Sequence, residues 1–482
     1  MGNNTQEQIN RVIREMEEKY GSGKRTNNAY LNDTFVETPN STGSLGSFEH
    51  VEDAIAAAKQ SQKQLMELTM ATRKLIIASM RKASIENAEK LAIMAQEETG
   101  FGRVADKIIK NVLAAEKTPG TEDLESKAYT GDDGMTLIER APFGVIGSIT
   151  PSTNPSSTVI NNSISMVAAG NGVVYNPHPH AKKVCLETIA ILNKAISDAG
   201  GPSELLTAPI NPTMASSSVI MKHKDIRMLA VTGGEAVVEI AMKSGKKCIA
   251  AGPGNPPVIV DETANIKKAA SDIVKGSGFD NNVLCIAEKE AFVVNSVFNE
   301  LVSEMVLNGA YELKRHEIDI VTKEVFTKNK KGETVVNRNY VGKYASDILK
   351  ACNIPVHNDV KLIIAEVPDT HPFINIEMLM PVFGMVRVYS VEEAIEKAVI
   401  AEKGYHHTAI MHSENVTNLT KAARALDTTI FVKNAPSYAG LGIEGEGFTT
   451  LTIATPTGEG LTSARSFTRI RRCTLSGGFR IV

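Results

Sequence analysis

Cys285 is a candidate nucleophile in this chain, to be weighed against the more usual role of a buried structural cysteine. It is one of five cysteines in 482 residues, it follows the turn "KGSGFDNN", and its immediate neighbours are apolar. A reactive thiolate needs a nearby cation, a base or backbone N–H donors. No such side chain is adjacent to Cys285 in the sequence. Local chemistry therefore favours a buried, inert cysteine, and any activation of the thiol must come from the fold.

Histidine and glycine motifs are weak signals by themselves. His178 and His180 in "NPHPH" have no third ligand nearby, which argues against a metal site. His406 and His407 begin a strand-like run, so we expect them to point to opposite faces, with at most one facing a cleft. The stretch "GLGIEG" from Gly440 matches a dinucleotide pattern but does not follow a β-branched strand, so we interpret it as a glycine-rich loop.

Composition narrows the class of protein. The formal net charge is -3, which argues against a nucleic-acid or acidic-membrane partner because no strong positive field can form. The cysteines are odd in number and widely spaced, so they indicate neither a disulfide framework nor a zinc site and fit a reducing cytosol. No run approaches the roughly 18 apolar residues of a membrane span. We therefore expect a soluble, cytoplasmic protein without a metal.

Strand-like and helical runs alternate from Gly144 onward. The runs "GVIGSIT", "GVVYN" and "MLAVT" are each followed by a polar loop and a helical pattern. This alternation predicts an α/β fold with a mostly parallel sheet that helices cover on both faces. Ligands bind beyond the carboxyl ends of strands in such sheets. The loops "TPSTNPSS", "NPHPH" and "TGGEA" are therefore expected at a binding site.

The first 46 residues differ from the rest of the chain. Within residues 1–20, apolar side chains recur at spacings of three and four and form one narrow stripe on a predicted amphipathic helix. Residues 21–46 are rich in Gly, Ser, Asn and Thr, which is typical of a flexible linker. A tethered helix of this kind either docks on a partner protein or folds back on its own body, and the pattern leaves both open.

Several stretches, taken in order, carry a family resemblance. The chain resembles the aldehyde dehydrogenase superfamily, and more narrowly the CoA-acylating acetaldehyde and propionaldehyde dehydrogenases of ethanolamine and propanediol utilisation. The resemblance extends from about residue 47 to residue 482. The segments that carry it are "TPSTNP", "VYNPHP", "VTGGEAV", "AAGPGNPPVIVDETA", "FDNNVLC", "EMLMPV" and "PTGEGLTSARSFTRIRR".

The resemblance implies a domain organisation. Residues 47–255 are expected to form a Rossmann-like NAD-binding domain, with a flap strand at about 133–142. Residues 256–434 are expected to form a catalytic α/β domain. Residues 435–482 are expected to return to the cofactor domain and complete a β-strand oligomerisation flap, so we expect a homodimer or homotetramer.

The resemblance also implies roles for particular residues. Cys285 corresponds to the family's nucleophile, Asn154 to its oxyanion-holding amide, and Glu377 to its nicotinamide-ribose ligand. His407 is the candidate base for the thiol of coenzyme A, because acylating relatives also have a histidine in this strand. The remaining contacts expected for NAD are Thr150, Pro151, Ser152, Thr153, Asn176, His178, Thr232, Gly233, Gly234 and Gly252.

Two departures from hydrolytic family members are informative. Asn176 replaces their lysine in the ribose-binding loop, so ribose binding must differ, and His178 is a candidate to help. Their general-base glutamate has Ala250 or Ala251 at its place, and no acidic residue occurs between residues 239 and 261. A thioester on the nucleophilic cysteine would then persist until coenzyme A, a better nucleophile than water, attacks it.

Alternatives remain open in the sequence. A hydrolytic aldehyde dehydrogenase could activate water with Glu288 or Asp280, and a catalytically silent scaffold is a second possibility. Acetaldehyde and propionaldehyde differ by one methylene, worth only about 1–3 kcal/mol in a pocket, so the preferred substrate stays open. Residues 4–20 resemble the family's targeting peptide, which implies binding to a shell protein inside a bacterial microcompartment.

Overall fold

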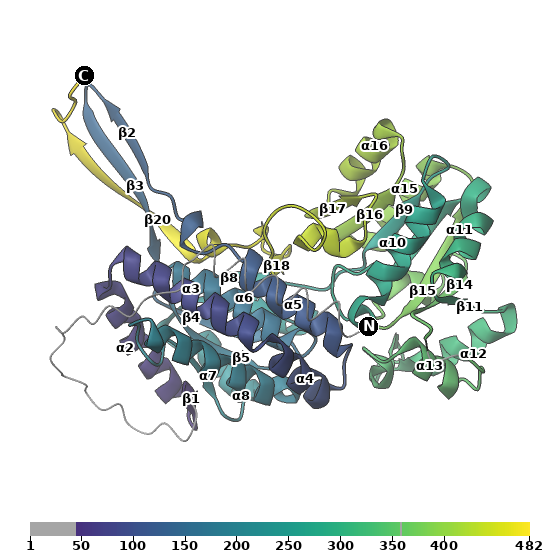
Figure 1. Ribbon diagram of the computed structural model, residues 1–482, viewed down its shortest axis with the longest axis horizontal. Helices are drawn as coiled ribbons and strands as arrows, with labels where there is room; N and C mark the ends of the chain where they lie inside the picture. Colours follow the sequence, from purple (N-terminus) through teal and green to yellow (C-terminus); the bar gives the residue numbers. More distant parts are fainter. Residues whose placement is uncertain (1–44, 357–358) are drawn as a thin grey trace.

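Two parallel β-sheets, each covered by helices, form the body of the protein, and a narrow antiparallel ribbon projects from it (Figure 1). The computed structural model describes residues 45–356 and 359–482. The helix predicted within residues 1–20 and the linker up to residue 44 lie outside the described residues. The predicted α/β class with parallel sheets is confirmed.

The first sheet has six parallel strands in the order β1-β6-β5-β4-β7-β8. Its central strands are buried along their whole length, which explains why their sequences are continuous apolar runs with few polar positions. The strands are β1 (Ser47–Phe48), β4 (Val145–Thr150), β5 (Gly172–Pro177), β6 (Leu206–Pro209), β7 (Ile226–Thr232) and β8 (Lys247–Ala251).

Helices cover both faces of this sheet. Successive residues of a strand point to opposite faces, so Val145 and Ile149 of β4 join one hydrophobic cluster while Ile146 joins another. The first face carries α2 (Val51–Glu67), α8 (Met214–Lys222) and α9 (Glu235–Met242), and the second carries α3 (Met70–Glu86), α4 (Ala88–Thr99), α5 (Val104–Lys117), α6 (Pro155–Ala168) and α7 (Lys182–Asp198).

The second sheet has seven parallel strands in the order β11-β14-β15-β10-β9-β16-β17. Helices again lie on both of its faces. The strands are β9 (Pro257–Val260), β10 (Glu290–Val294), β11 (Ala310–Glu312), β14 (Leu362–Glu366), β15 (Val382–Val388), β16 (Thr408–His412) and β17 (Ile430–Lys433). The helices are α10 (Ile266–Gly278), α11 (Asn295–Leu307), α12 (Arg315–Val325), α13 (Ala345–Ala351), α14 (Pro372–Asn375), α15 (Val391–Glu402) and α16 (Val416–Leu426).

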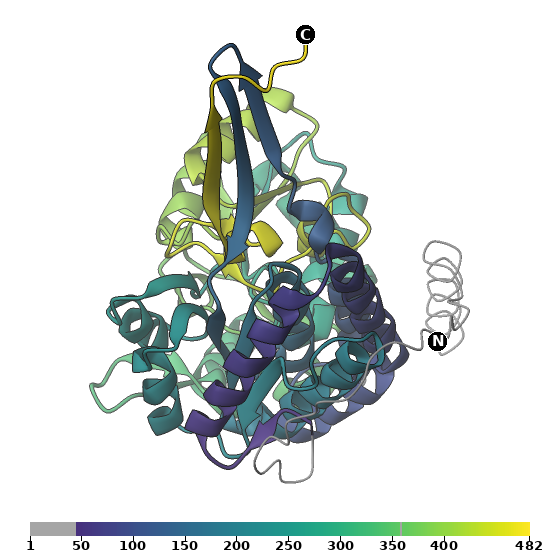
Figure 2. The same cartoon turned by 90° about the vertical axis from the view of Figure 1, so that its left-hand side faces the viewer.

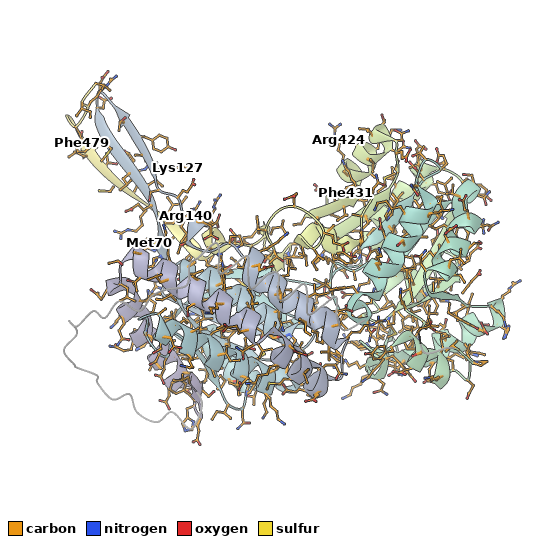
Figure 3. The ribbon with its side chains drawn as sticks, in the orientation of Figure 1. Met70, Lys127, Arg140, Arg424, Phe431 and Phe479 are labelled. Atoms are coloured by element: carbon orange, nitrogen blue, oxygen red, sulfur yellow. The ribbon has the colours of Figure 1, made fainter. Side chains whose placement is uncertain are left out.

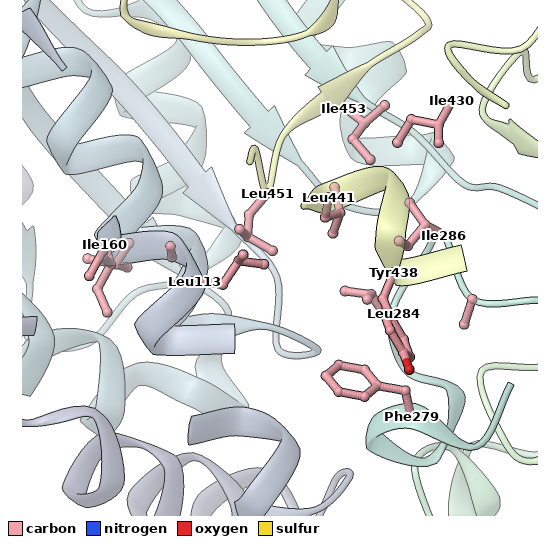
Figure 4. Packing of buried hydrophobic residues seen from close by; sticks show 14 of the residues in the cluster. Leu113, Ile160, Phe279, Leu284, Ile286, Ile430, Tyr438, Leu441, Leu451 and Ile453 are labelled. Carbon is pink, nitrogen blue, oxygen red and sulfur yellow. The ribbon is translucent and has the colours of Figure 1, made fainter. Parts of the chain in front are cut away.

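One hydrophobic cluster extends from the first sheet to the second. Leu113 of α5 and Ile160 of α6 lie on the side of the first sheet, and Leu284 and Ile286 lie in the loop before β10 (Figure 4). Leu451, from the C-terminal part of the chain, lies between the two groups (Figure 4). Close packing of this kind resists deformation, so the edges of the two sheets are held at a fixed separation.

The projecting ribbon is a three-stranded antiparallel sheet in the order β2-β3-β20 (Figure 2). β3 (Gly134–Pro142) pairs along its length with β20 (Thr468–Ser476), so segments more than 300 residues apart become neighbours. β2 (Lys127–Gly131), a strand that the sequence patterns did not single out, completes the ribbon. Lys127 and Phe479 lie on it, far from Arg424 of α16 and Phe431 of β17 (Figure 3). The outer edge of β20 has no strand partner in the described chain, as in sheets that pair with another subunit.

Two smaller features complete the described chain. β12 (Phe326–Lys328) and β13 (Thr334–Val336) form an antiparallel hairpin, and β18 (Ile453–Ala454) pairs with β19 (Gly460–Leu461). Among the described residues, no helix combines the length and apolar character that a bilayer span requires. The same part of the chain contains no cluster of three or more side chains suited to a metal ion.

Candidate active site

The site lies where the two sheets present opposite ends to each other. On the first sheet it uses the carboxyl ends of strands: Thr150 ends β4, Pro177 ends β5 and Thr232 ends β7. On the second sheet it uses the loops that precede strands β9, β10, β15 and β16. These loops contain Gly254, Cys285, Glu377 and His407, respectively.

Cys285 follows an unusual turn. Asp280, Asn281 and Asn282 all have positive φ angles, of 48, 52 and 65°. The left-handed conformation costs roughly 1–2 kcal/mol per residue for most side chains, and Asn and Asp tolerate it best. Three such residues in succession turn the chain sharply out of α10 and leave Cys285 partly exposed ahead of β10.

Buried hydrogen bonds hold this turn. The carboxylate of Asp280 accepts a bond from the backbone N–H of Arg103 at 2.7 Å. Asn281 donates to the carbonyl of Gly342 at 2.9 Å, and Asn282 donates to the carbonyls of Ser277 and Glu288, both at 2.9 Å. Because every side chain of the turn is bonded to another segment, the position of the thiol is determined by the surrounding fold.

Lys289 is buried beneath the cysteine loop. Its Nζ donates to the backbone carbonyls of Asn282 at 3.0 Å and Leu284 at 3.3 Å, and to the side-chain Oδ1 of Asn282 at 2.6 Å. Burial lowers the pKa of Lys289, and the neighbouring Glu377 and Cys285 act in the opposite direction. No cation is adjacent to Cys285 in the sequence, but this lysine, four residues further on, is in electrostatic contact with the thiol in the folded chain.

The thiol of Cys285 is poised between opposing influences. Its pKa is raised to about 11, chiefly because the surrounding protein desolvates the thiol and also because the Glu377 carboxylate lies nearby. Lys289, the backbone N–H of Cys285 itself and Lys110 lower it. In the free protein at neutral pH the residue is therefore mainly a thiol, and formation of the thiolate depends on the two buried lysines.

Gly254 brings three of the candidate residues together. A Cβ at this position would lie 2.9 Å from Cγ of His407 and 3.2 Å from the carbonyl oxygen of Cys285. The backbone N–H of Gly254 also donates to the carboxylate of Glu377, whose pKa burial nevertheless raises to about 7. No larger residue fits between the imidazole and the cysteine, so Gly254 is part of the site although the sequence analysis did not select it.

His407 is buried and His406 is exposed. The expectation that at most one of the two faces inward is met, although both precede β16 and His406 adopts a left-handed φ of 53°. Burial, together with the charge of Lys289, lowers the pKa of His407 to about 4, so its ring is neutral at physiological pH. Its Nδ1 lies 2.9 Å from Oγ1 of Thr408, while its buried Nε2 has no hydrogen-bond partner among the described residues.

Asn154 lies on the opposite side of the site, at the start of α6 directly after β4. Its Oδ1 accepts a hydrogen bond from Nζ of Lys110 at 2.5 Å. Its Nδ2 makes a long contact of 3.4 Å to Oγ1 of Thr153. The amide N–H group is thus available to an incoming oxygen, which is the requirement for an oxyanion donor.

The first sheet provides an edge suited to a dinucleotide. Thr150 ends β4, residues 151–153 lie between β4 and the start of α6, and Gly233 and Gly234 lie between β7 and the start of α9. A Cβ on Gly234 would meet no atom within 4 Å, so the backbone at this helix start faces open space. Gly252 follows β8 and packs on Pro456, where a Cβ would lie 2.9 Å from Cγ. Helix N-termini with uncovered N–H groups bind phosphate, so these residues fit NAD.

Two candidate ligands lie at the carboxyl end of β5: Asn176 belongs to the strand, and His178 directly follows it. Asn176 is buried, accepts from Oγ of Ser216 at 2.6 Å and donates to the carbonyl of Thr213 at 3.4 Å, so its side chain supports the start of α8. The His178 side chain is exposed overall. Partial desolvation of its ring lowers its pKa, and the neighbouring His180 and Arg338 lower it further. Of the two, His178 is the residue free to contact a ribose.

Arg338 and Lys328 belong to a cavity of about 680 Å³ that the sequence analysis missed. The cavity lies between the β12–β13 hairpin and the loop that contains Glu377. It joins two basic side chains to Glu377, the residue expected at the nicotinamide ribose. These cations come from a polar segment with no recognisable motif, and their position depends on the hairpin.

The carboxylates considered for water activation are already engaged. Asp280 is fully buried and forms ion pairs with Lys107 and Lys110. Glu288 is fully buried and accepts hydrogen bonds from the hydroxyl and backbone N–H of Ser437 at 2.6 and 2.8 Å. Neither residue is free to deprotonate a water molecule at the thiol.

The "GLGIEG" stretch has no role as a dinucleotide fingerprint. Gly440 lies in a 3₁₀ turn, Ser437–Leu441, and no helix follows it before the hairpin at β18. Nζ of Lys117 donates to the carbonyls of Gly442 and Gly445 at 2.6 and 3.1 Å. This contact fastens the loop to the end of α5, in agreement with its interpretation as a glycine-rich loop.

A partly exposed cysteine and an amide donor, set beside a sheet whose helix N-termini can hold a dinucleotide, are the arrangement of a thiol-dependent dehydrogenase. Comparison with known proteins agrees with this class. The chain belongs to the aldehyde dehydrogenase family, whose model matches residues 24–315.

Relatives of known activity span almost the whole chain. It is 51% identical to acetaldehyde dehydrogenase (acetylating) EutE of Salmonella typhimurium, covering 91% of this chain and 94% of that protein. The propionaldehyde dehydrogenase of the Clostridium phytofermentans fucose utilisation bacterial microcompartment is 49% identical, with a TM-score of 0.88 over 91% of this chain and 100% of that chain. A Rhodopseudomonas palustris propionaldehyde dehydrogenase with bound CoA and an acylated cysteine is 46% identical, with a TM-score of 0.87 over 90% of this chain and 99% of that chain.

Proposed function

We propose that this protein is a CoA-acylating aldehyde dehydrogenase, which converts a short aliphatic aldehyde, CoA and NAD to acyl-CoA and NADH. The observation that carries the proposal is the set of groups placed around the Cys285 loop. Gly254 lies against both the neutral His407 imidazole and the Cys285 carbonyl, and Lys110 links the Asn154 amide to Asp280 of the turn before Cys285. Asp280 and Glu288 are bonded elsewhere. The acetylating and CoA-bound relatives support the same reaction.

The first half of the reaction forms an acylated cysteine. The Cys285 thiolate attacks the aldehyde carbon and gives a thiohemiacetal. The Asn154 amide and the backbone N–H of Cys285 donate to the oxyanion, and removal of one such donor typically lowers turnover about 100- to 1000-fold. The loops at the carboxyl edge of the first sheet would hold NAD, which would supply the hydride acceptor for oxidation of the thiohemiacetal carbon. Cys285 is left as a thioester.

The second half transfers the acyl group to a thiol. Neutral His407 has a free Nε2 that can accept the proton of the CoA thiol. The thiolate of CoA then adds to the thioester carbonyl, the same oxyanion donors act again, and Cys285 leaves as a thiolate. Ala250 and Ala251 occupy the place of the hydrolytic family members' base, so no activated water competes with the CoA thiol for the thioester.

The decisive experiment is steady-state formation of NADH with and without CoA. We expect sustained turnover with CoA, acyl-CoA as the product, and a single burst of NADH without CoA. Sustained turnover without CoA, with release of a carboxylic acid, would instead identify a hydrolytic enzyme. Acetaldehyde and propionaldehyde should be compared in the same assay, because one methylene separates them.

We also propose that residues 4–20 direct the protein to a microcompartment shell protein and that the β2-β3-β20 ribbon joins subunits into a dimer or tetramer. One of the similar structures comes from a microcompartment. Deletion of residues 1–20 should preserve activity and abolish co-localisation with the shell. Deletion of the ribbon's β20 strand should shift the sedimentation coefficient to that of a monomer, and an unchanged value would contradict this assignment.

A further inference from the structure

Lys110 joins the nucleophile loop to the oxyanion amide. Helix α5 crosses from the first sheet toward the second. Its Lys110 is only 3% exposed. Nζ of Lys110 contacts two oxygens: Oδ1 of Asn154 and Oδ2 of Asp280. Asn154 follows β4 of the first sheet, whereas Asp280 lies five residues before Cys285. One ammonium group therefore spans the interface across which the nucleophile and its amide donor must be aligned.

The bond to Lys110 also determines which end of the Asn154 amide faces the substrate. An asparagine amide has one accepting oxygen and one donating NH₂ group, whereas an ammonium group can only donate. Reversal of the amide would direct its NH₂ group at the ammonium of Lys110 and lose the bond. Nδ2 therefore points away from Lys110, and its remaining contact to Thr153 is long, at 3.4 Å.

Neighbouring side chains hold α5 and the start of α6 in this position. Asn111 donates to the carbonyl of Ala88 at 3.0 Å and accepts from the hydroxyl of Ser156 at 2.8 Å. Ser156 is the second residue of α6, two positions after Asn154. The lysine and the amide are therefore carried by elements that are bonded to each other next to the site.

We propose that Lys110 is a positioning residue for the acylation chemistry: it orients the Asn154 amide toward the oxyanion and fixes its separation from Cys285. This inference rests on the proposed role of Cys285 and Asn154, but it concerns the acylation step and is independent of whether the acyl group passes to CoA or to water.

Lys107 is a matched control on the same helix. It is equally buried, at 3%, and its Nζ lies 3.0 Å from Oδ2 of Asp280. Unlike Lys110, it has no hydrogen bond to Asn154 among those of the described chain. Lys107→Met and Lys110→Met thus each remove one buried cation from the same carboxylate. They differ in the contact to the amide and in the influence of Lys110 on the Cys285 thiol, which the alkylation rate measures.

The test is the single-turnover burst of NADH, measured without CoA for Lys110→Met, Lys107→Met, Asn154→Ala and the Lys110→Met/Asn154→Ala double variant. We expect Lys110→Met to slow the burst about 10- to 100-fold, because loss of an oriented donor typically costs about 100-fold or more. Lys107→Met should change the burst rate less than about threefold, although it should lower the melting temperature about as much as Lys110→Met does. Asn154→Ala should have little further effect in the Lys110→Met background, because residues that act as a unit are non-additive.

A second readout separates orientation of the amide from activation of the thiol. Alkylation of Cys285 by iodoacetamide forms no oxyanion, so Lys110→Arg, which retains charge and donors, should alkylate at the wild-type rate and recover part of the burst. Equal losses in Lys110→Met and Lys107→Met would overturn the proposal, as would a full Asn154→Ala effect in the double variant. If Lys110→Met does not fold, Lys110→Gln, which keeps a donor without the charge, replaces it in the cycle. Absence of any burst in the wild type would instead contradict the proposed function.

Discussion

The two parallel sheets meet at the site with opposite ends, and this difference explains how each edge is built. At the first sheet, α6 and α9 begin beside the site, and a helix N-terminus carries a partial positive charge. At the second sheet, α10 and α15 end shortly before Cys285 and His407, and a helix C-terminus carries a partial negative charge. The first edge therefore suits anionic phosphates, whereas the second opposes formation of a thiolate.

The second edge compensates with buried cations. Lys289 binds the carbonyls of the cysteine loop from below, and Lys110 reaches it from α5. The first edge uses backbone N–H groups and small residues such as Gly233 and Gly234. The comparison teaches that the cofactor edge depends on backbone geometry, whereas the thiol edge depends on a few charged side chains. Equivalent substitutions on the two edges should therefore impair different kinetic properties of the enzyme.

The largest expected effect is on the cysteines. Cys285→Ala should abolish NADH formation, at least about 10⁴-fold, because covalent catalysis loses its nucleophile. Cys248 lies in strand β8 of the first sheet and is only partly buried, so Cys248→Ala removes few packing contacts. This variant should retain activity within about twofold. Stopped-flow absorbance of NADH measures both. Substantial turnover in Cys285→Ala would mean that another group attacks the aldehyde.

A matched pair of glycines distinguishes the edges next. Gly254→Ala should lower kcat about 100-fold, because its Cβ would lie 2.9 Å from His407 and misplace groups that must align within about 1 Å. Gly234→Ala meets no protein atom within 4 Å, so it should fold normally and raise the KM for NAD with little change in kcat. Steady-state kinetics with varied NAD and aldehyde separate the two. A loss of kcat in both variants would contradict the assignment of cofactor binding to the first edge and of thiol chemistry to the second.

A matched pair of lysines tests the charge requirement. The Cys285 thiol has a pKa raised to about 11, so its alkylation rate should increase about tenfold per pH unit from pH 7 to 10. Lys289→Met removes a group that lowers this pKa, so alkylation at a given pH should fall about tenfold. Lys246, which binds the carbonyls of His223 and Ile226 at 2.9 and 2.8 Å beside the first sheet, supplies the control Lys246→Met. Iodoacetamide labelling followed by mass spectrometry gives the rates, and equal slowing in both variants would assign Lys289 a purely structural role.

The smallest effect is expected at His407. His407→Ala should slow acyl transfer to CoA up to about tenfold and spare the NADH burst, because a thiol is already partly ionised near neutrality. Its pKa of about 4 keeps the imidazole neutral, so the effect should not vary between pH 6 and 8. His412→Ala, at the last residue of β16, which His407 directly precedes, changes a similarly buried histidine and serves as the control. Unchanged transfer to CoA in His407→Ala would remove this residue from the mechanism.

Much of the architecture could be predicted from the sequence. Alternation of apolar strands and helical runs indicates parallel sheets, because a strand buried on both faces is apolar throughout and needs a crossover helix. β3 and the C-terminal strand were expected near each other from the family resemblance. β2 was not expected, since its exposed, polar residues have no strand-like alternation. Asn176 was named among the expected NAD contacts, and the hydrogen bond from Ser216 that holds its amide at the start of α8 could not be read from the sequence.

The sequence by itself determined the fold class and, through its ordered motifs, singled out Cys285, Asn154, Glu377 and His407. Tertiary structure alone decided what surrounds them. Lys110 meets Asp280 across 170 residues of chain, and Gly254 lies against His407 across more than 150 residues. No local pattern encodes such contacts, because burial, pKa and the orientation of an amide depend on groups brought together by packing. The chemistry of the thiol is therefore a property of the interface between the two sheets.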